Sequence, residues 1–269
     1  MLPFKCFILL ICYCFLACNA LQCITNCSYT LSFGIPFDVP VQCSQVASAG
    51  KCHVVVTFWY YLQEYVVTLN AGSSNTISSS DNQRHAMFEV RPTDSYYFKY
   101  DIHHACKDRN DCAQDFARAA ITEMIQRKID YQSIISELRP LVSADSQSEN
   151  TTNLVCFDSE ETTSQCAVAT NLGSCVIADK LIEKEITYYC NTGMHARLGY
   201  LNISDSGSFA TFDIHCNQSL CNELSTLKAA KSILFKYGLT ETPEGRLNNS
   251  SQLIKISVWL IISLLAIKN

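Results

Sequence analysis

The stretch Gln42–Cys52, QCSQVASAGKC, occurs a second time as Gln165–Cys175, QCAVATNLGSC. In both places a Gln-Cys pair is followed after six residues by a glycine and, one residue later, by another cysteine. Self-similarity at a fixed distance is the sequence signature of a repeated structural unit. The stretch therefore predicts that the chain contains two copies of one cysteine-bearing module.

Two further landmarks repeat in the same order. An aromatic-Asp-Ile-His tetrad precedes a closely spaced cysteine pair, and a basic-Ala-Ala triplet follows the pair inside a helical pattern. The landmarks are Tyr100–His103, Cys106, Cys112 and Arg118–Ala120 in the first copy, and Phe212–His215, Cys216, Cys221 and Lys228–Ala230 in the second. Three landmarks in one order favour an internal duplication.

The cysteines predict how the modules are held together. Of the 16 cysteines, four lie within residues 1–20. The other twelve are Cys23, Cys27, Cys43, Cys52, Cys106, Cys112, Cys156, Cys166, Cys175, Cys190, Cys216 and Cys221. An even number in an exported chain predicts six disulfides, and the absence of a CxxC pair among them disfavours structural zinc. Short loops favour Cys106–Cys112 and Cys216–Cys221, and the other pairings stay open.

The two ends of the chain are apolar. Residues 1–20 carry one cation, Lys5, then an apolar run that closes on small residues, which is the pattern of a secretory signal peptide. Residues 253–269 form a hydrophobic C-terminal tail whose apolar run, 256–267, is shorter than the roughly 20 residues of a spanning helix. The ends place the region between them outside the cell.

Two interpretations of the tail remain open. Asn248, Asn249 and Ser250 are small residues suited to accept a glycosylphosphatidylinositol anchor, after which the tail would be removed. The alternative is a single membrane span with the same ectodomain. The lipid anchor is favoured because no cytoplasmic basic cluster follows the apolar run.

Charge and sequons agree with export. Removal of both ends takes three of the 20 basic residues and none of the 25 acidic ones, which leaves a formal charge of −8. An acidic chain does not offer the cationic face that nucleic acid requires. The sequons within the ectodomain, each a candidate glycosylation site, are Asn26, Asn150, Asn202 and Asn217. Asn150 and Asn202 are expected in loops.

Residue patterns predict strands followed by a helix in each copy. A hairpin is expected over 52–69 with its turn at Gln63–Glu64, and further strands over 86–90, 96–102, 175–178, 186–190 and 208–214. Helices are expected over 112–128, capped by Asn110 or Asp111, over 130–138, stopped by Pro140, and over 223–237, ended by Gly238.

The fold class that follows is α+β: two repeated small disulfide-rich modules, each an antiparallel β-sheet followed by an amphipathic helix. The expected domains are a signal peptide (1–20), module 1 with a helical extension (21–142), a linker (143–154), module 2 with a C-terminal helix (155–240), a stalk with the anchor-attachment region (241–252) and the tail (253–269).

The start Leu21–Cys23 and the ending Cys216–Asn222 resemble the three-finger family of urokinase-receptor and lymphocyte-antigen domains. The resemblance implies a hairpin-built, lipid-anchored surface protein that binds other proteins, in which Asn222 ties the C-terminal end to the first strands. The chain departs from that family in three places. Three residues separate Cys23 from Cys27, no Asn follows Cys112, and each copy continues into a helix.

Candidate chemical sites are few. His103 and His104 near Cys106, or His215 beside Cys216, could be metal ligands, but a cysteine held in a disulfide offers no thiolate, so no metal or cofactor is expected. The pairs Asp101/His103 and Asp213/His215 each share one face of a strand. An acid-oriented histidine suggests a secreted hydrolase as the alternative function, although no nucleophile is tied to either pair.

The segment Thr57–Tyr61 is rich in aromatic residues, which are enriched at binding surfaces. Alternation along a strand sends half of them outward, so Trp59 and Tyr61 are the candidates for a contact surface. The predicted function is non-enzymatic recognition at the extracellular face of the plasma membrane, in adhesion or receptor modulation. The expected partner is another extracellular or membrane protein, with the outer membrane leaflet holding the lipid anchor.

Overall fold

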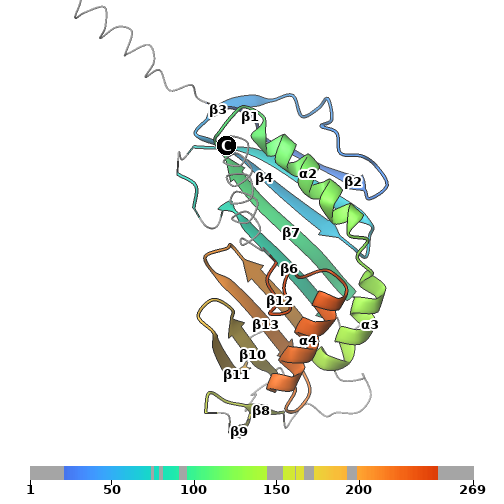
Figure 1. Cartoon of the computed structure of the whole chain (residues 1–269), viewed down its shortest axis with the longest axis vertical. Coiled ribbons are helices and arrows are strands. Elements are labelled where there is room, and N and C mark those ends of the chain that lie inside the picture. The colour runs from blue at the N-terminus through green and yellow to red at the C-terminus, as the bar shows by residue number, and fades with distance from the viewer. Residues whose placement is uncertain are drawn as a thin grey trace, which may run out of the picture.

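The computed structural model describes residues 21–247 apart from 74–75, 79–80, 91–95, 144–153, 161, 167–172 and 193–198. These residues form an α+β fold in which a long antiparallel sheet carries three helices on one face (Figure 1). The predicted signal peptide, tail and most of the predicted linker lie outside the described residues.

The chain alternates between strands and helices. The strands are β1 (Leu21–Ile24), β2 (Cys27–Ser32), β3 (Val46–Ala49), β4 (Lys51–Trp59), β5 (Glu64–Gly72), β6 (Gln83–Val90), β7 (Tyr96–Cys106), β8 (Val155–Phe157), β9 (Thr163–Gln165), β10 (Ser174–Lys180), β11 (Glu185–Asn191), β12 (Gly199–Asp205) and β13 (Ala210–Cys216). The helices are α2 (Cys112–Gln126), α3 (Tyr131–Val142) and α4 (Leu224–Lys236).

One sheet runs through both halves of the chain. Its nine strands lie in the order β11-β10-β13-β12-β6-β7-β4-β5-β2, and β1 with β3 and β8 with β9 form two small ladders beside it. The first half (residues 21–143) meets the second half (154–247) where β6 pairs with β12, from Val90 opposite Gly199 to Arg84 opposite Asp205. The small sheets expected for separate modules are therefore joined into one.

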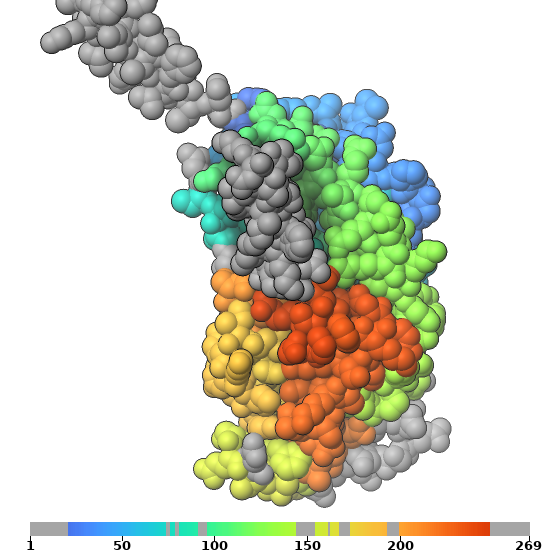
Figure 2. Space-filling view, viewed as in Figure 1, coloured from blue at the N-terminus to red at the C-terminus, as the bar shows by residue number. Residues whose placement is uncertain are grey.

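The core lies between the sheet and the helices. On β4 the alternate residues Val54, Val56 and Phe58 are buried, because period-two alternation turns them toward the helical side. Helix α2 packs on β4 and β7, whereas α3 and α4 pack beside each other over the second half. In the space-filling view the three helices and the segment after α4 cover this side of the molecule (Figure 2).

Helix ends follow the sequence in part. Gly238 has a φ of +71°, and the Leu239 N–H donates to the Leu234 carbonyl at 2.9 Å, which is the expected glycine C-cap of α4. Asp111 does occupy the N-cap of α2, yet its side chain makes no capping bond. The capping chemistry predicted for Asn110 or Asp111 was therefore wrong, since Asn110 Oδ1 instead accepts from the Gln22 N–H at 2.8 Å.

Pro140 does not stop α3, which continues to Val142. Asp130 caps the helix by accepting from the Ser133 N–H at 3.1 Å. Because Pro140 lies in the last turn, the donor it lacks removes only one bond near the helix end. The end of α3 then packs closely on β12, where a Cβ at Gly199 would lie only 2.3 Å from the Val142 carbonyl oxygen.

The strands extend beyond the predicted limits. The hairpin turn lies at residues 60–63 and the next strand already begins at Glu64, one residue from the expected turn; Gln63 takes a left-handed φ of 56° there. The sequence did not predict β12, although this strand joins the two halves.

All twelve cysteines of the described residues are paired, and each bridge stays within one half. The bridges are Cys23–Cys52, Cys27–Cys43, Cys106–Cys112, Cys156–Cys175, Cys166–Cys190 and Cys216–Cys221. Both local bridges expected from the short loops are present. Such crosslinks belong to an oxidising compartment, which is consistent with a secreted or extracellular protein.

Residues 241–247 are part of the folded body and not of a stalk. Asp205 is fully buried and accepts from Arg246 Nε at 2.7 Å and Nη2 at 2.9 Å. Leu247 is also fully buried, and its carbonyl accepts from Arg84 on β6 at 3.2 Å. The stalk predicted over 241–252 is thus wrong for its first seven residues, because a partly buried ion pair and the buried Leu247 hold them on the helical side of the sheet.

Candidate functional site: the helix-free face of the sheet

The face of the sheet opposite the helices carries the candidate site. Since alternate residues turn Val54, Val56 and Phe58 toward the helices, Thr57 and Trp59 lie on the other side. The same alternation places His85 of β6 and Asn202 of β12 there. We call this side the helix-free face.

A chain of polar side chains crosses the junction between the two halves on this face. Asp101 of β7 lies 3.0 Å from Lys99 Nζ and 3.2 Å from His85 Nδ1. The other ring nitrogen of His85 is hydrogen-bonded to Asn202 of β12. Asn202 in turn bonds Asp213, which is opposite it on β13. We call Lys99, Asp101, His85, Asn202 and Asp213 the seam network.

The pKa values of the two carboxyl groups in the seam network are shifted in opposite directions. Burial alone would raise the pKa of Asp101, but hydrogen bonds from His85, Lys99 and Thr57 lower it to about 2. Burial raises the pKa of Asp213 above its ordinary value, against the hydrogen bond from Asn202. Asp101 is therefore ionised at neutral pH, whereas Asp213 binds a proton more readily than an ordinary aspartate.

His215 lies beside this network on β13. Its Nε2 is 2.7 Å from the hydroxyl of Tyr200, and the two rings stack with centroids 3.9 Å apart. Burial lowers the pKa of His215 to about 4. Its Nδ1 is buried and finds no hydrogen-bond partner among the described residues. The neutral ring therefore accepts a hydrogen bond from the Tyr200 hydroxyl at neutral pH.

This arrangement predicts an acid-sensitive fold. Because the folded-state pKa of His215 lies below the unfolded value of 6.5, the unfolded chain takes up the proton first as the pH falls. The contribution of His215 to the free energy of unfolding should be fully present above pH 6.5. It should fall by about 3 kcal/mol as the pH approaches 4. We expect His215→Gln, measured by thermal unfolding at pH 7.5 and 4.5, to lose much less on acidification than the native chain.

The other titrating groups set the background for that comparison. The pKa values of His53, His103 and His104 are also lowered by burial and act in the same direction. The raised pKa of Asp213 acts in the opposite direction, since its stabilising proton is gained on acidification. An equal acid-induced loss in His215→Gln and in the native chain would assign the effect to these groups and contradict the prediction.

The predicted Asp/His pairs are not assembled as catalytic dyads. The histidine that Asp101 bonds is His85 and not His103, and the partner of His215 is Tyr200. Both ring nitrogens of His85 are engaged, by Asp101 and Asn202, so this ring has no nitrogen left to activate a hydroxyl nucleophile. The hydrolase alternative gains no support from this geometry.

The structure also does not bring the predicted metal-ligand residues together into one site. His104 turns to the helical side and stacks on Phe116 of α2, with centroids 3.7 Å apart. Among the described residues, one cluster has metal-ligand spacing, Cys106 with Asp108 and Cys112. Since Cys106 and Cys112 form a disulfide, that cluster offers one carboxylate and no thiolate.

The aromatic residues singled out in the sequence do meet at one end of the helix-free face. Trp59 packs edge-on against Tyr97 at a centroid distance of 4.9 Å, and Tyr61 lies 6.0 Å from both rings. Tyr61 is 39% exposed, and the neighbouring turn residue Leu62 is 51% exposed. We call Trp59, Tyr61 and Tyr97 the aromatic cluster.

The sequons lie in different settings. Asn202 is in the middle of β12 with its amide engaged by His85 and Asp213, so the expectation that it lies in a loop was wrong. Asn26 occupies the turn between β1 and β2 with a φ of 52°, and Asn217 lies in the loop closed by the last bridge. Asn150 and the candidate anchor residues Asn248, Asn249 and Ser250 lie outside the described residues.

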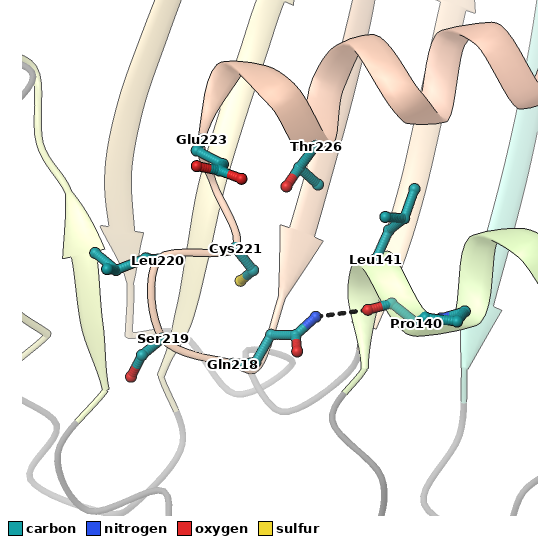
Figure 3. A pocket seen from close by; sticks show the side chains of 8 residues that line it. All are labelled: Pro140, Leu141, Gln218, Ser219, Leu220, Cys221, Glu223 and Thr226. Atoms are coloured by element: carbon teal, nitrogen blue, oxygen red, sulfur yellow. Dashed lines mark hydrogen bonds between the residues drawn. The ribbon is translucent and has the colours of Figure 1, made fainter.

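A small cavity opens on the other side of the molecule, between the end of α3 and the start of α4. Its volume is about 280 Å³, and Gln218 spans it by donating from Nε2 to the Pro140 carbonyl at 2.8 Å (Figure 3). Cys221 lines it, but the thiol is consumed in a disulfide. The cysteine of this cavity therefore offers no free thiol.

The sequence matches no protein-family model and no curated protein. Across the described residues, no helix combines the length and apolar character needed to cross a bilayer. The sequence pattern also missed His85 and Lys99 as members of the candidate face. Period-two alternation along β6 and β7 was the available signal, because it separates the members of each face.

Proposed function

We propose that the protein is an extracellular, lipid-anchored recognition protein that binds another protein through the helix-free face of its sheet. The observation that carries the proposal is the aromatic cluster, where Tyr61 is 39% exposed on the face that no described helix covers. Aromatic side chains supply large contact area at low entropic cost and dominate binding energy at interfaces.

The disulfides support a role in recognition. Six bridges hold the loops and hairpins, so the surface loses little conformational freedom when it binds. The seam network adds fixed charges near the centre of the same face, which would orient a polar partner.

The proposal includes an internal duplication. In the first half the order β6-β7-β4-β5 matches β12-β13-β10-β11 in the second. Cys23–Cys52 and Cys156–Cys175 each join a short ladder to the strand that begins the main hairpin. The strand order and the bridges support two copies of one module, fused edge to edge.

The three-finger resemblance is part of the proposal too. Asn222 follows the last bridge, is fully buried, and bonds the backbone of Phe157 in β8 and of Val176 in β10. This is the role that the resemblance implied for that residue. The helices and the shared sheet go beyond that resemblance.

The membrane tether is tested on cells that display the full chain. A phosphatidylinositol-specific phospholipase is expected to shed the protein if a lipid anchor is attached at Asn248, Asn249 or Ser250. Protein that stays on the cell after enzyme treatment, with a known anchored protein shed in parallel, would favour the single-span alternative.

The recognition surface is tested with the double variant Trp59→Ser/Tyr61→Ser. Multimerised extracellular domains of membrane proteins serve as probes, and bound probe is counted on cells displaying each variant. We expect the double variant to weaken binding at least about tenfold, since central aromatic residues contribute about 2 kcal/mol or more.

A matched control separates this face from the helical side. Phe235 on α4 is 44% exposed, close to the exposure of Tyr61, so Phe235→Ser removes a similar aromatic surface from the opposite side. Binding should survive this change. Loss of binding in Phe235→Ser with retention in the double variant would place the recognition surface on the helices instead.

A further inference from the structure

The two ends of the long sheet differ in whether a further strand pairs with the outer strand of the main hairpin. At one end β2 pairs with β5 over six residues, from Cys27 opposite Leu69 to Ser32 opposite Glu64. At the other end β11 pairs with β10 and, within the described residues, has no strand on its outer side. Figure 1 shows β11 at the outer margin of the second half.

The disulfides at the two ends of the sheet also differ in the strand to which they are attached. Cys43, which precedes β4, is bridged to Cys27 on β2, so this bridge holds the covering strand of the first half. Cys166, which precedes β10, is bridged to Cys190 on β11 itself. Among the described residues the second half therefore has no counterpart of β2, and its edge bridge is made directly to the edge strand.

The exposed residues of the two outer strands also differ. On β2 they are Ser28, Thr30 and Ser32, which are small and polar. On β11 they include Ile186 at 36% and Tyr189 at 45% exposure. Large apolar side chains on an outer strand favour pairing with another strand, whereas polar ones discourage it.

We propose that β11 is a self-association edge, where two copies of this chain pair β11 with β11 in antiparallel orientation. The β5–β2 pairing shows that the corresponding edge of the first half accepts an antiparallel strand. Identical edges related by a two-fold axis close on themselves and give a dimer, whereas pairing of β11 with β2 of another copy would continue into a filament.

The sequence of β11 is compatible with pairing to itself. With the two-fold axis at Thr187, Ile186 lies opposite the partner's Tyr188, and Glu185 lies opposite the partner's Tyr189. Glu185 is the sole charged residue of the strand, so no like charges face each other. This register uses residues 185–189 and leaves Cys190, with its bridge to Cys166, outside the pairing.

A second copy is the favoured occupant because the proposed lipid anchor would hold copies on one membrane surface, where they meet at a raised effective concentration; this step rests on the proposed function. A strand pair of five residues is a small interface, so tethering matters for its occupancy. Pairing at the end of the sheet leaves the aromatic cluster of the first half uncovered. Self-association is thus independent of whether that cluster binds a partner.

The test uses a charge exchange at the axis. Full chains carrying two different tags are co-expressed, and co-purification is measured after copies on the intact cell surface have been crosslinked and then solubilised in detergent. Native copies are expected to co-purify. Thr187→Lys alone and Thr187→Glu alone should each reduce co-purification at least about tenfold, because like charges then face each other across the axis.

Co-expression of Thr187→Lys with Thr187→Glu should restore association to near the native level. Thr30→Lys on β2, an exposed threonine at the other end of the sheet, is the matched control and should leave association unchanged. Cell-surface yield and absence of free thiols verify that each variant folds. Native copies that do not co-purify, single variants that still associate, or a mixed pair that stays apart would each overturn the proposal.

Discussion

Replacement of Asn222 by alanine is expected to destabilise the second half of the structure strongly. The side chain of Asn222 is fully buried and makes three hydrogen bonds to backbone groups. Its Oδ1 accepts from the Phe157 N–H at 3.0 Å, and its Nδ2 donates to the carbonyls of Phe157 at 3.0 Å and Val176 at 3.1 Å. Alanine would remove all three bonds, two of them from part-buried groups of Phe157 and one from the buried carbonyl of Val176.

The size of the effect follows from the three backbone groups that lose a hydrogen bond. Each costs about 1–3 kcal/mol when it is left unsatisfied, so we expect a loss of about 3–5 kcal/mol after partial relaxation. That is a large part of the 5–15 kcal/mol that typically stabilises a domain. Urea unfolding of the purified ectodomain and its secreted yield are the measurements.

Asn110→Ala is the control for this prediction. Asn110 also accepts a backbone bond, from the Gln22 N–H at 2.8 Å, but at an exposed position. Water can replace that bond, so the expected loss is about 0.5–1.5 kcal/mol. Equal losses in the two variants would show that burial of Asn222 does not set its contribution.

Local features of the fold could be predicted from the sequence. The hairpin of β4 and β5 was predicted because β-branched and aromatic residues fill a run on both sides of a tight turn. The bridges Cys106–Cys112 and Cys216–Cys221 were predicted because their loops are short. Gly238 was predicted to end α4 because glycine adopts a positive φ without strain.

The joining of the two halves could not be predicted in this way. His85 and Asn202 are separated by 117 positions in the chain, and their hydrogen bond depends on the β6–β12 pairing. No local pattern specifies which strands from distant segments become neighbours. The seam network was missed for that reason, and Asn202 was placed in a loop because its own strand was not predicted.

The unmatched cysteines have a physical explanation in the sheet. The sequence showed no counterparts for Cys23, Cys27, Cys156 and Cys190. In the structure Cys23 and Cys156 play the same part, each bridging to the cysteine at the start of a main hairpin. Cys27 and Cys190 remain different because, in the part of the chain that the structure describes, a strand like β2 covers the edge of the first half only.

The second large effect is expected for Asp205→Ala, which should release the C-terminal segment from the sheet. Asp205 is fully buried and accepts from Arg246 at two nitrogens, from the Leu247 N–H at 3.0 Å and from the Gly207 N–H at 2.9 Å. Removing Asp205 takes this acceptor from the Arg246 side chain, which is 20% exposed, and from the Leu247 and Gly207 N–H groups, at a cost of about 2–3 kcal/mol. We expect this loss in urea unfolding, together with faster amide exchange over residues 241–247.

Lys180→Ala is the matched control, because Lys180 and Glu185 form an ion pair at 2.7 Å with both side chains largely in solvent. Solvent screens such a pair, so its removal should change stability little. Faster exchange over 241–247 is specific to Asp205→Ala, because Arg246 and Leu247 then lose their shared acceptor. If exchange there stays slow while global stability falls, the segment is held by the apolar burial of Leu247 and not by the ion pair. The predicted anchor residues Asn248, Asn249 and Ser250 follow directly after Leu247. Release of residues 241–247 would therefore lengthen the segment between the folded body and the predicted anchor.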